Sequence, residues 1–342
     1  MNGHQRVTAA LQGNWPDKRP VMLHNFMPAA REAGMTQAEY RASAENIATA
    51  HIRAAEKYDL DGVLIDVDTA TVAAALGVPT DYPEDEPARC HGAMLAELEA
   101  VGDLGPVDLC RAECVMAWVE ACRLVKAHFG DEKFIRGNCD QLPFSLASMI
   151  RTPQAWMMDL MDPEGEEHVF ALLAYCVDAC AGFVELVSAA GVDMISHGDS
   201  PAGPDMIAPA MYRKYALPYQ KRIAELAHAR GRAYLLHICG STEPILPDML
   251  ATGADALELD YKTDVRAIHR VCGEQVTLSG NIDPSGVMAL GTPDLVAAKT
   301  RELLEVYEDS PRLIVCSGCA LPPATPEANM RAMINTVRGC TT

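Results

Sequence analysis

The stretch AYLLHICGSTEPILPDMLATGADALELD, residues 233–260, indicates the fold class. It begins and ends with short apolar runs, AYLLHI at 233–238 and ADALELD at 254–260. The segment between them is long enough for a helix, and Pro244 stands where the first turn of that helix would begin. Short strands that alternate with helices are typical of parallel βα units. The stretch therefore predicts two parallel strands joined by a helix.

The same alternation extends along the chain. An amphipathic helix opens the sequence, and longer helical patterns cover residues 43–57, 94–129 and 166–190. We predict eight strands, at residues 19–25, 61–66, 133–138, 192–197, 233–238, 254–260, 275–280 and 312–316. This pattern favours an α/β fold of the closed (β/α)8 TIM-barrel type, with an open doubly wound sheet as the alternative. We expect residues 1–342 to form a single barrel domain with an N-terminal helical extension, and residues 79–87 to form an exposed acidic loop.

The charge balance excludes two classes of partner. The 342 residues include 28 Lys and Arg against 47 Asp and Glu, a formal net charge of −19. Such a chain is a poor electrostatic match for nucleic acid or for anionic lipid, so we expect neither as a partner. The N-terminus has no signal-peptide pattern and no long uncharged apolar run follows, which predicts a cytoplasmic protein. We expect most of the 12 cysteines to be reduced residues of the core.

Residues that can bind metals or carry protons follow most of the predicted strands. In a closed barrel, the carboxyl ends of the strands carry the chemistry. The residues found at these ends are His24 and Asn25, Asp66 and Asp68, Asn138, His197 and Asp199, His237 and Cys239, Asp260, Asn281, and the segment from Cys316 to Cys319.

The pattern His237-Ile238-Cys239 is the sharpest local feature. Residues two apart on a strand point the same way, so the imidazole and the thiol can converge on one ion. Cys316 and Cys319 follow the last strand, and barrel closure would bring them to the same rim. Three nitrogen or sulfur donors with one open position are typical of a catalytic zinc site. The spacing alone leaves a buried histidine among core thiols as the alternative.

Asp66 and Asp68 are a second candidate pair. Two carboxylates two residues apart can serve proton transfer or bind a cationic substrate group, and an aspartate that caps the next helix is the other interpretation. The chain has no Walker A motif, no G-x-G-x-x-G after a strand and no nucleophile elbow. ATP-binding, dinucleotide-binding and α/β-hydrolase functions are therefore not expected.

The sequence resembles the uroporphyrinogen decarboxylase superfamily and, within it, the methylcobalamin:coenzyme M methyltransferase branch. The resemblance covers most of the chain, and its clearest segments are residues 137–150, 197–218, 237–240, 279–284 and 317–329. It implies a (β/α)8 barrel.

Several positions favour the methyltransferase branch over the decarboxylases. The arginine motif with which decarboxylases hold substrate carboxylates is replaced by Asn-Phe-Met-Pro at residues 25–28. Ser148 and Cys319 stand where decarboxylases carry a tyrosine and a histidine, whereas their aspartate after the second strand is retained as Asp68.

The resemblance implies a zinc site made by His237, Cys239 and Cys319. Asp260 falls where the branch has a glutamate that is the fourth ligand until a thiol substrate displaces it, and its side chain is one methylene shorter. The resemblance further implies that His197 and Asp199 orient the substrate near the metal.

The implied activity moves a methyl group between a corrinoid and a thiol-type small-molecule acceptor. We expect Asn138, Asn281 and Asp66 to take part in binding the substrate. Because the chain lacks a D-x-H-x-x-G cobalamin motif, the methylcobalamin or related corrinoid would arrive on a partner corrinoid protein. The alternatives are a decarboxylase-like lyase that acts through Asp68, and a zinc-bearing relative that uses another methyl donor or only binds a corrinoid.

Overall fold

Eight parallel strands form one sheet that closes on itself. The computed structural model describes residues 1–339. The strand order is β1-β2-β5-β6-β7-β8-β9-β10, and a parallel bridge between Val21 and Val315 joins the first strand to the last. The Val315 N–H donates to the Pro20 carbonyl at 2.9 Å across this seam. The predicted barrel is confirmed, and the open-sheet alternative is wrong.

The observed strands match the eight predicted runs. Their bounds are β1 Met22–Leu23, β2 Gly62–Ile65, β5 Phe134–Gln141, β6 Met194–Gly198, β7 Ala233–Ile238, β8 Ala256–Leu259, β9 Thr277–Ile282 and β10 Leu313–Ser317. Nearly every strand residue is buried, because helices cover the outside and side chains fill the inside. This burial on both faces explains why the runs are mostly apolar and show no regular alternation of apolar and polar residues.

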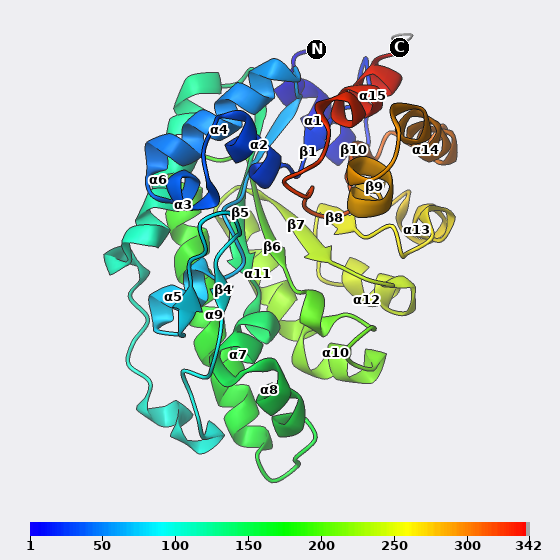
Figure 1. The fold of residues 1–342 in the computed structure, drawn as a ribbon. Helices are drawn as coiled ribbons and strands as arrows, with labels where there is room; N and C mark the ends of the chain where they lie inside the picture. The colour runs from blue at the N-terminus through cyan, green and yellow to red at the C-terminus, as the bar shows by residue number, and fades with distance from the viewer. Residues whose placement is uncertain (340–342) are drawn as a thin grey trace.

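The helices surround the strands (Figure 1). Their bounds are α1 Gly3–Leu11, α2 Phe26–Glu32, α3 Gln37–Arg41, α4 Ala44–Lys57, α5 Thr71–Leu76, α6 Glu113–Phe129, α7 Pro143–Arg151, α8 Pro153–Asp159, α9 Glu166–Ala189, α10 Pro209–Tyr215, α11 Leu217–Ala229, α12 Leu246–Leu250, α13 Val265–Cys272, α14 Pro293–Val306 and α15 Glu327–Arg338. Proline occupies the first turn of α7, α8, α10, α11, α12 and α14, where its missing N–H costs no hydrogen bond.

The long helix α9 belongs to this outer layer. Within the described residues it is the one helix long and apolar enough to cross a membrane by length and composition. It packs against α7, α11 and β5, and its buried side chains include Leu172, Val177 and Phe183. The apolar composition of α9 therefore reflects its place against the barrel.

Two predicted segments differ from the structure. Only the second half of residues 94–129 is a long helix, α6, because the glycines and the proline of Gly102–Pro106 interrupt the first half, which contains two short 3-10 turns. The acidic loop at 79–87 is exposed for the most part, as expected, but it lies within a small antiparallel hairpin of β3 Thr80–Asp81 and β4 Arg89–Cys90.

One buried carboxylate ties both ends of the described chain to the amino-terminal side of the barrel. Asp61 precedes β2 and is 2% exposed. Its Oδ1 accepts from Arg6 of α1 at 3.0 Å, and its Oδ2 accepts from Arg338 of α15 at 2.7 Å and from the Val21 N–H at 2.8 Å. This carboxylate therefore joins α1, α15 and the start of β1 at the end of the barrel opposite the candidate site.

Candidate metal centre

His237 and Cys239 converge at the carboxyl end of β7. The strand places both side chains on the same side, and His237 Nε2 lies 3.0 Å from Cys239 Sγ. His237 is buried and Cys239 is half-buried. The pair predicted from the H-x-C spacing is therefore present.

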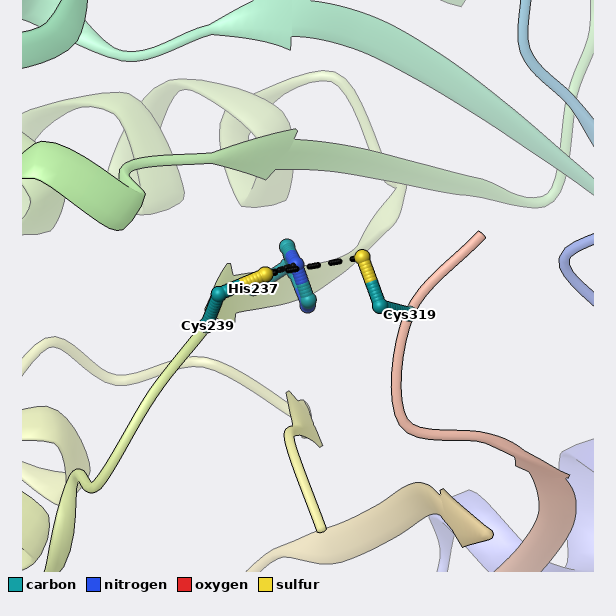
Figure 2. Close-up of side chains that lie close together, drawn as sticks. All are labelled: His237, Cys239 and Cys319. Carbon is teal, nitrogen blue, oxygen red and sulfur yellow. Dashed lines mark hydrogen bonds between the residues drawn. The ribbon is translucent and has the colours of Figure 1, made fainter. Parts of the chain in front are cut away.

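Cys319 completes the group from the segment after β10. Its Sγ lies 3.5 Å from Cys239 Sγ, and the three donor atoms are within 4.8 Å of one another. Figure 2 shows the three side chains pointing toward a common centre from β7 and from the segment that follows β10. Cys316, the other cysteine of that segment, is fully buried and lies outside the group.

The segment that carries Cys319 is pressed against the end of β8. The Gly318 N–H donates to the Ile282 carbonyl at 2.9 Å, and Ser317 Oγ donates to the Cys319 carbonyl at 2.7 Å. A Cβ on Gly318 would lie 2.7 Å from the Leu259 carbonyl oxygen. Glycine is therefore required for this approach, which sets the position of Cys319.

The donor set fits zinc. Zinc bonds of about 2.3 Å to sulfur and about 2.0–2.1 Å to nitrogen, at tetrahedral angles, place neighbouring donors about 3.5–3.8 Å apart. The separations of 3.0 and 3.5 Å reach that range if the group opens by about half an ångström or less. One imidazole, two thiols and a mouth open to a cavity form the donor set of a three-ligand catalytic site.

The far side of the imidazole is fixed. His237 Nδ1 lies 3.0 Å from the backbone carbonyl of Glu258 and 3.4 Å from its Oε1. A proton on Nδ1 can be donated to these oxygens, which leaves the lone pair of Nε2 facing the thiols and able to bind a metal ion.

The pKa values of the two thiols are shifted in opposite directions. The hydrogen bond with Cys319 and the neighbouring His237 hold the pKa of Cys239 well below its usual range, against the effect of burial. The same hydrogen bond and burial raise the pKa of Cys319. The group therefore holds a thiolate readily at Cys239, and a bound cation would favour the thiolate at both positions.

We call His237, Cys239 and Cys319 the metal group. A cavity of about 440 Å³ opens in front of it. It combines an apolar surface with several buried polar side chains. Besides His237, Cys239, Cys319 and Glu258, its wall includes His24, Phe26, Met27, Asp66, Asp68, Pro87, Arg136, Asn138, Gln141, Met149, Ser200, Pro201 and Ala320.

Four charged residues of this wall are linked by a buried series of ion-paired hydrogen bonds. His24 lies between two carboxylates, with Nδ1 3.0 Å from Glu258 Oε1 and Nε2 2.7 Å from Asp66 Oδ2. The other oxygen of Glu258 accepts from Arg136. Both cations of the wall are therefore paired with carboxylates.

Two neutral side chains, Ser196 and Asn138, connect the two ends of this series of hydrogen bonds. Arg136 Nε donates to Ser196 Oγ at 2.8 Å, and Ser196 Oγ donates to Asn138 Oδ1 at 3.2 Å. Asn138 Nδ2 then donates to Asp66 Oδ1 at 2.9 Å. These six residues form a closed loop of hydrogen bonds that we call the polar ring: His24, Asp66, Arg136, Asn138, Ser196 and Glu258.

The polar ring sets the charge states of its members. Burial acts to lower the pKa of His24, but the charge of Glu258 and the hydrogen bond with Asp66 outweigh it and raise that pKa to about 9. Burial acts to raise the pKa of Glu258, but Arg136 and His24 hold it below its usual range. At neutral pH, His24 is therefore a cation and Glu258 an anion.

Three of the predicted site residues line the cavity: Asp66 and Asn138, predicted to bind the substrate, and Asp68, predicted as a possible catalytic residue. Asp68 Oδ1 accepts from the N–H groups of Ala70 and Thr71, both at 2.8 Å, so this oxygen caps the start of α5. The capping interpretation accounts for one oxygen of Asp68, while the residue also faces the cavity.

Three other predicted residues lie elsewhere. His197 is fully buried with Nδ1 3.4 Å from the Tyr234 hydroxyl, and burial lowers its pKa to about 3. Asp199 is also fully buried and accepts from Ser145 Oγ at 2.6 Å. Asn281 lines a separate cavity of about 310 Å³ beside α14 and donates from Nδ2 to the Thr263 carbonyl at 3.2 Å. None of the three is part of the wall of the cavity in front of the metal group.

Asp260 lies beside the metal group and outside it. Its Oδ2 accepts from the Gly240 N–H at 3.0 Å, and its Oδ1 accepts from the Lys262 N–H at 3.2 Å. It lines a second cavity of about 370 Å³ that also touches Cys239. These contacts hold the loop after β7 in place, and the fourth-ligand role of Asp260 stays a prediction.

The sequence pattern did not predict Arg136 or Glu258 as site residues, and it placed His24 only at a strand end. Arg136 and Glu258 interrupt the otherwise apolar runs at 133–138 and 254–260. A charged residue inside a strand buried on both faces needs a partner, and that is the signal that could have found them.

The family is settled by comparison with known proteins. The uroporphyrinogen decarboxylase (URO-D) family matches residues 2–340. The chain belongs to the uroporphyrinogen decarboxylase family. Among its relatives, the methylcobamide:CoM methyltransferase MtbA of Methanosarcina acetivorans is 34% identical over 217 residues, which is 63% of this chain and 61% of that protein. The match thus spans less than two thirds of that relative's length.

A second relative covers nearly the whole length. The methylcobamide:CoM methyltransferase MtaA of Methanosarcina barkeri is 25% identical over 336 residues, 96% of this chain and 95% of that protein. A solved methyltransferase from Methanosarcina mazei superposes with a TM-score of 0.90 at 22% identity and covers 99% of each chain. That structure supports the barrel fold of this family member.

Proposed function

We propose that this uroporphyrinogen decarboxylase family protein is a zinc-dependent methyltransferase that moves a methyl group between a corrinoid and a thiol. The observation that carries the proposal is the group of His237, Cys239 and Cys319, whose donor atoms lie within 4.8 Å of one another at the edge of a cavity. The names of the relatives MtbA and MtaA support the same reaction class.

Zinc held by these three residues would supply the Lewis acidity that makes a coordinated substrate thiol a thiolate at neutral pH. The chain's own residues position that thiol. Glu258 keeps Nε2 of His237 directed at the thiols through its backbone carbonyl. The cavity wall encloses the rest of the acceptor and limits the access of water.

The methyl donor would reach the site from outside. We propose a corrinoid protein as the partner, with methylcobalamin or a related corrinoid as its cargo, because the relatives act on methylcobamide. The new S–C bond forms as the Co–C bond breaks, and the electron pair of the Co–C bond stays on cobalt. Asp260 remains our candidate for a fourth ligand that the acceptor displaces, since it lies beside Cys239 at the second cavity.

We also propose that residues 1–342 form one domain and that the protein works in the cytoplasm. One sheet takes its strands from both halves of the chain, which supports a single unit. The packing of α9 against α7, α11 and β5 supports its role as a helix of the barrel and not as a membrane anchor.

Metal content tests the proposal. We expect about one zinc per chain in the wild type, because a three-ligand site binds zinc with high affinity. Cys239→Ala and Cys319→Ala should each lose the metal and the transfer of methyl from methylcobalamin to a thiol. Elemental analysis of protein purified without added metal measures the first effect.

Cys316→Ala is the matched control, since it removes a thiol three residues from Cys319 that lies outside the group. It should keep its zinc. Zinc retained in both ligand variants, or a folded metal-free wild type, would contradict the proposal and favour a decarboxylase-like reaction at Asp68.

A further inference from the structure

Among the described residues, the cavity in front of the metal group has no unpaired positive charge. Its two cations, Arg136 and His24, already face Glu258, and His24 also faces Asp66. The carboxylates of Asp66, Asp68 and Glu258 outnumber these cations by one. An anionic head group placed here would have to compete with existing ion pairs.

The approach to the cavity is also acidic. Pro87 belongs to the cavity wall and ends the hairpin loop that carries Asp81, Glu84, Asp85 and Glu86. Arg89 is paired with Asp81 at 3.9 Å and with Glu86 at 3.0 Å. Arg41 donates to the backbone carbonyls of Glu86 and Pro83, so two cations stand against the four carboxylates of the loop, and the described residues provide no ion pair to Glu84 or Asp85. This loop repels anions and attracts cations on their way to the site.

One carboxylate oxygen is left for a ligand. Asp68 is 3% exposed, and both of its backbone hydrogen bonds and its bond from the Thr71 hydroxyl go to Oδ1. Its Oδ2 makes no hydrogen bond within residues 1–339, although the side chain lines the cavity. An acceptor that is open to the cavity and has no partner among the described residues favours a ligand that donates a hydrogen bond, and most of all a cation.

We propose that the acceptor at this site is a thiol whose head group is an ammonium or another hydrogen-bond donor, and not a sulfonate or carboxylate. This inference rests on the proposed function, because it assumes that the acceptor sulfur binds at His237, Cys239 and Cys319. The head group would then lie against Asp68 Oδ2, while Phe26, Met27 and Met149 contact the carbon chain. Burial raises the pKa of Asp68, a cost that an adjacent ammonium group offsets.

Three two-carbon thiols that differ only in their head group test the inference: 2-aminoethanethiol, 2-mercaptoethanol and 2-mercaptoethanesulfonate. The protein is loaded with Co²⁺ in place of zinc, and each thiol is titrated while the sulfur-to-cobalt charge-transfer band is followed. This measures binding without any methyl donor. We expect the aminothiol to bind at least tenfold more tightly than the sulfonate, with the alcohol between them.

Asp68→Asn isolates the effect of the carboxylate. Asparagine keeps an oxygen that can cap α5 but has no charge, so the preference for the aminothiol over the sulfonate should fall about tenfold. The thiols themselves ionise differently, but that difference cancels when the variant is compared with the wild type. Asp205→Asn, in the neighbouring cavity, should leave the preference unchanged.

The outcomes separate this inference from the proposed function. A sulfonate that binds as tightly as the aminothiol, or a preference that Asp68→Asn does not change, overturns the inference. Binding in the expected order without methyl transfer from methylcobalamin leaves the inference standing and overturns the proposed reaction. If none of the thiols perturbs the cobalt band of the loaded protein, both are overturned.

Discussion

His24 shows how one residue of the polar ring affects stability. It lies between Asp66 and Glu258, and its pKa in the folded protein is about 9, against about 6.5 in an unfolded chain. Because the folded pKa is the higher one, the charge of His24 stabilises the fold fully below about pH 6.5, and that contribution is lost as the pH rises through about 9.

We predict that His24→Gln is most destabilising near pH 6. The difference in free energy of unfolding from the wild type should shrink by about 3 kcal/mol between pH 6.5 and pH 9.5, because glutamine has no charge to lose. Urea unfolding of both apo-proteins across this range measures it. His128→Gln changes an exposed histidine and is the control, so its free energy of unfolding should differ little from that of the wild type at every pH. A difference for His24→Gln that does not change with pH would contradict the prediction.

At the scale of single residues, the sequence predicted the metal group better than its surroundings. His237 and Cys239 lie close because the repeat of a strand is two residues, and that rule is local. The contacts of Arg136 and Glu258 depend on strands β5 and β8 facing each other across the barrel interior, which a local pattern cannot express. His197 and Asp199 stand at a strand end as predicted, but they are buried beside Tyr234 and Ser145 instead of lining the cavity.

At the scale of elements, the segment after β10 positions Cys319 through a contact that only glycine permits. We predict that Gly318→Ala weakens zinc binding at least about tenfold, equivalent to about 1.4 kcal/mol. The added Cβ would lie 2.7 Å from the Leu259 carbonyl oxygen and 3.0 Å from Asp260 Cα, so the segment must move and shift Cys319 out of its present position relative to His237 and Cys239. Competition with a chromophoric zinc chelator measures the affinity.

Gly105→Ala is the control for this substitution. Gly105 has no atom within 4 Å of an added Cβ and does not require the left-handed backbone region. It should bind zinc as the wild type does. Equal zinc affinity in Gly318→Ala would show that the contact with β8 does not set the position of Cys319.

Elements were predicted well where burial was uniform. Each of the eight strands lies within two or three residues of its predicted run, since short, mostly apolar runs are hard to mistake when they alternate with helices. The segment before α6 was predicted wrongly as a long helix, because its apolar residues Leu98, Val101 and Leu109 are buried from two short 3-10 turns. Burial there came from tertiary contacts and not from a helical repeat.

At the scale of the whole molecule, Asp61 holds the barrel together at the end opposite the metal group. We predict that Asp61→Asn lowers the free energy of unfolding by about 3 kcal/mol, because Arg338 and Arg6 lose a buried anionic partner. The zinc content of the folded variant should stay at the wild-type value, since the substitution lies at the other end of the strands. Thermal unfolding and elemental analysis measure the two effects.

Asp59→Asn is the control, two residues away and 91% exposed at its side chain. Its pair with Lys133 at 3.6 Å lies at the surface, so the expected change is within about 0.5 kcal/mol. A similar small change in Asp61→Asn would mean that the other contacts of α1 and α15 hold these helices without the carboxylate.

The 80 residues that separate Cys239 from Cys319 also have a consequence for protein synthesis. A nascent chain that has emerged only as far as β7 presents one histidine and one cysteine, and two donors hold zinc weakly. The third donor appears three strands later and reaches the others only when β10 has docked between β9 and β1. Metal capture therefore follows closure of the barrel, and the bound ion marks a chain whose last strand is in place.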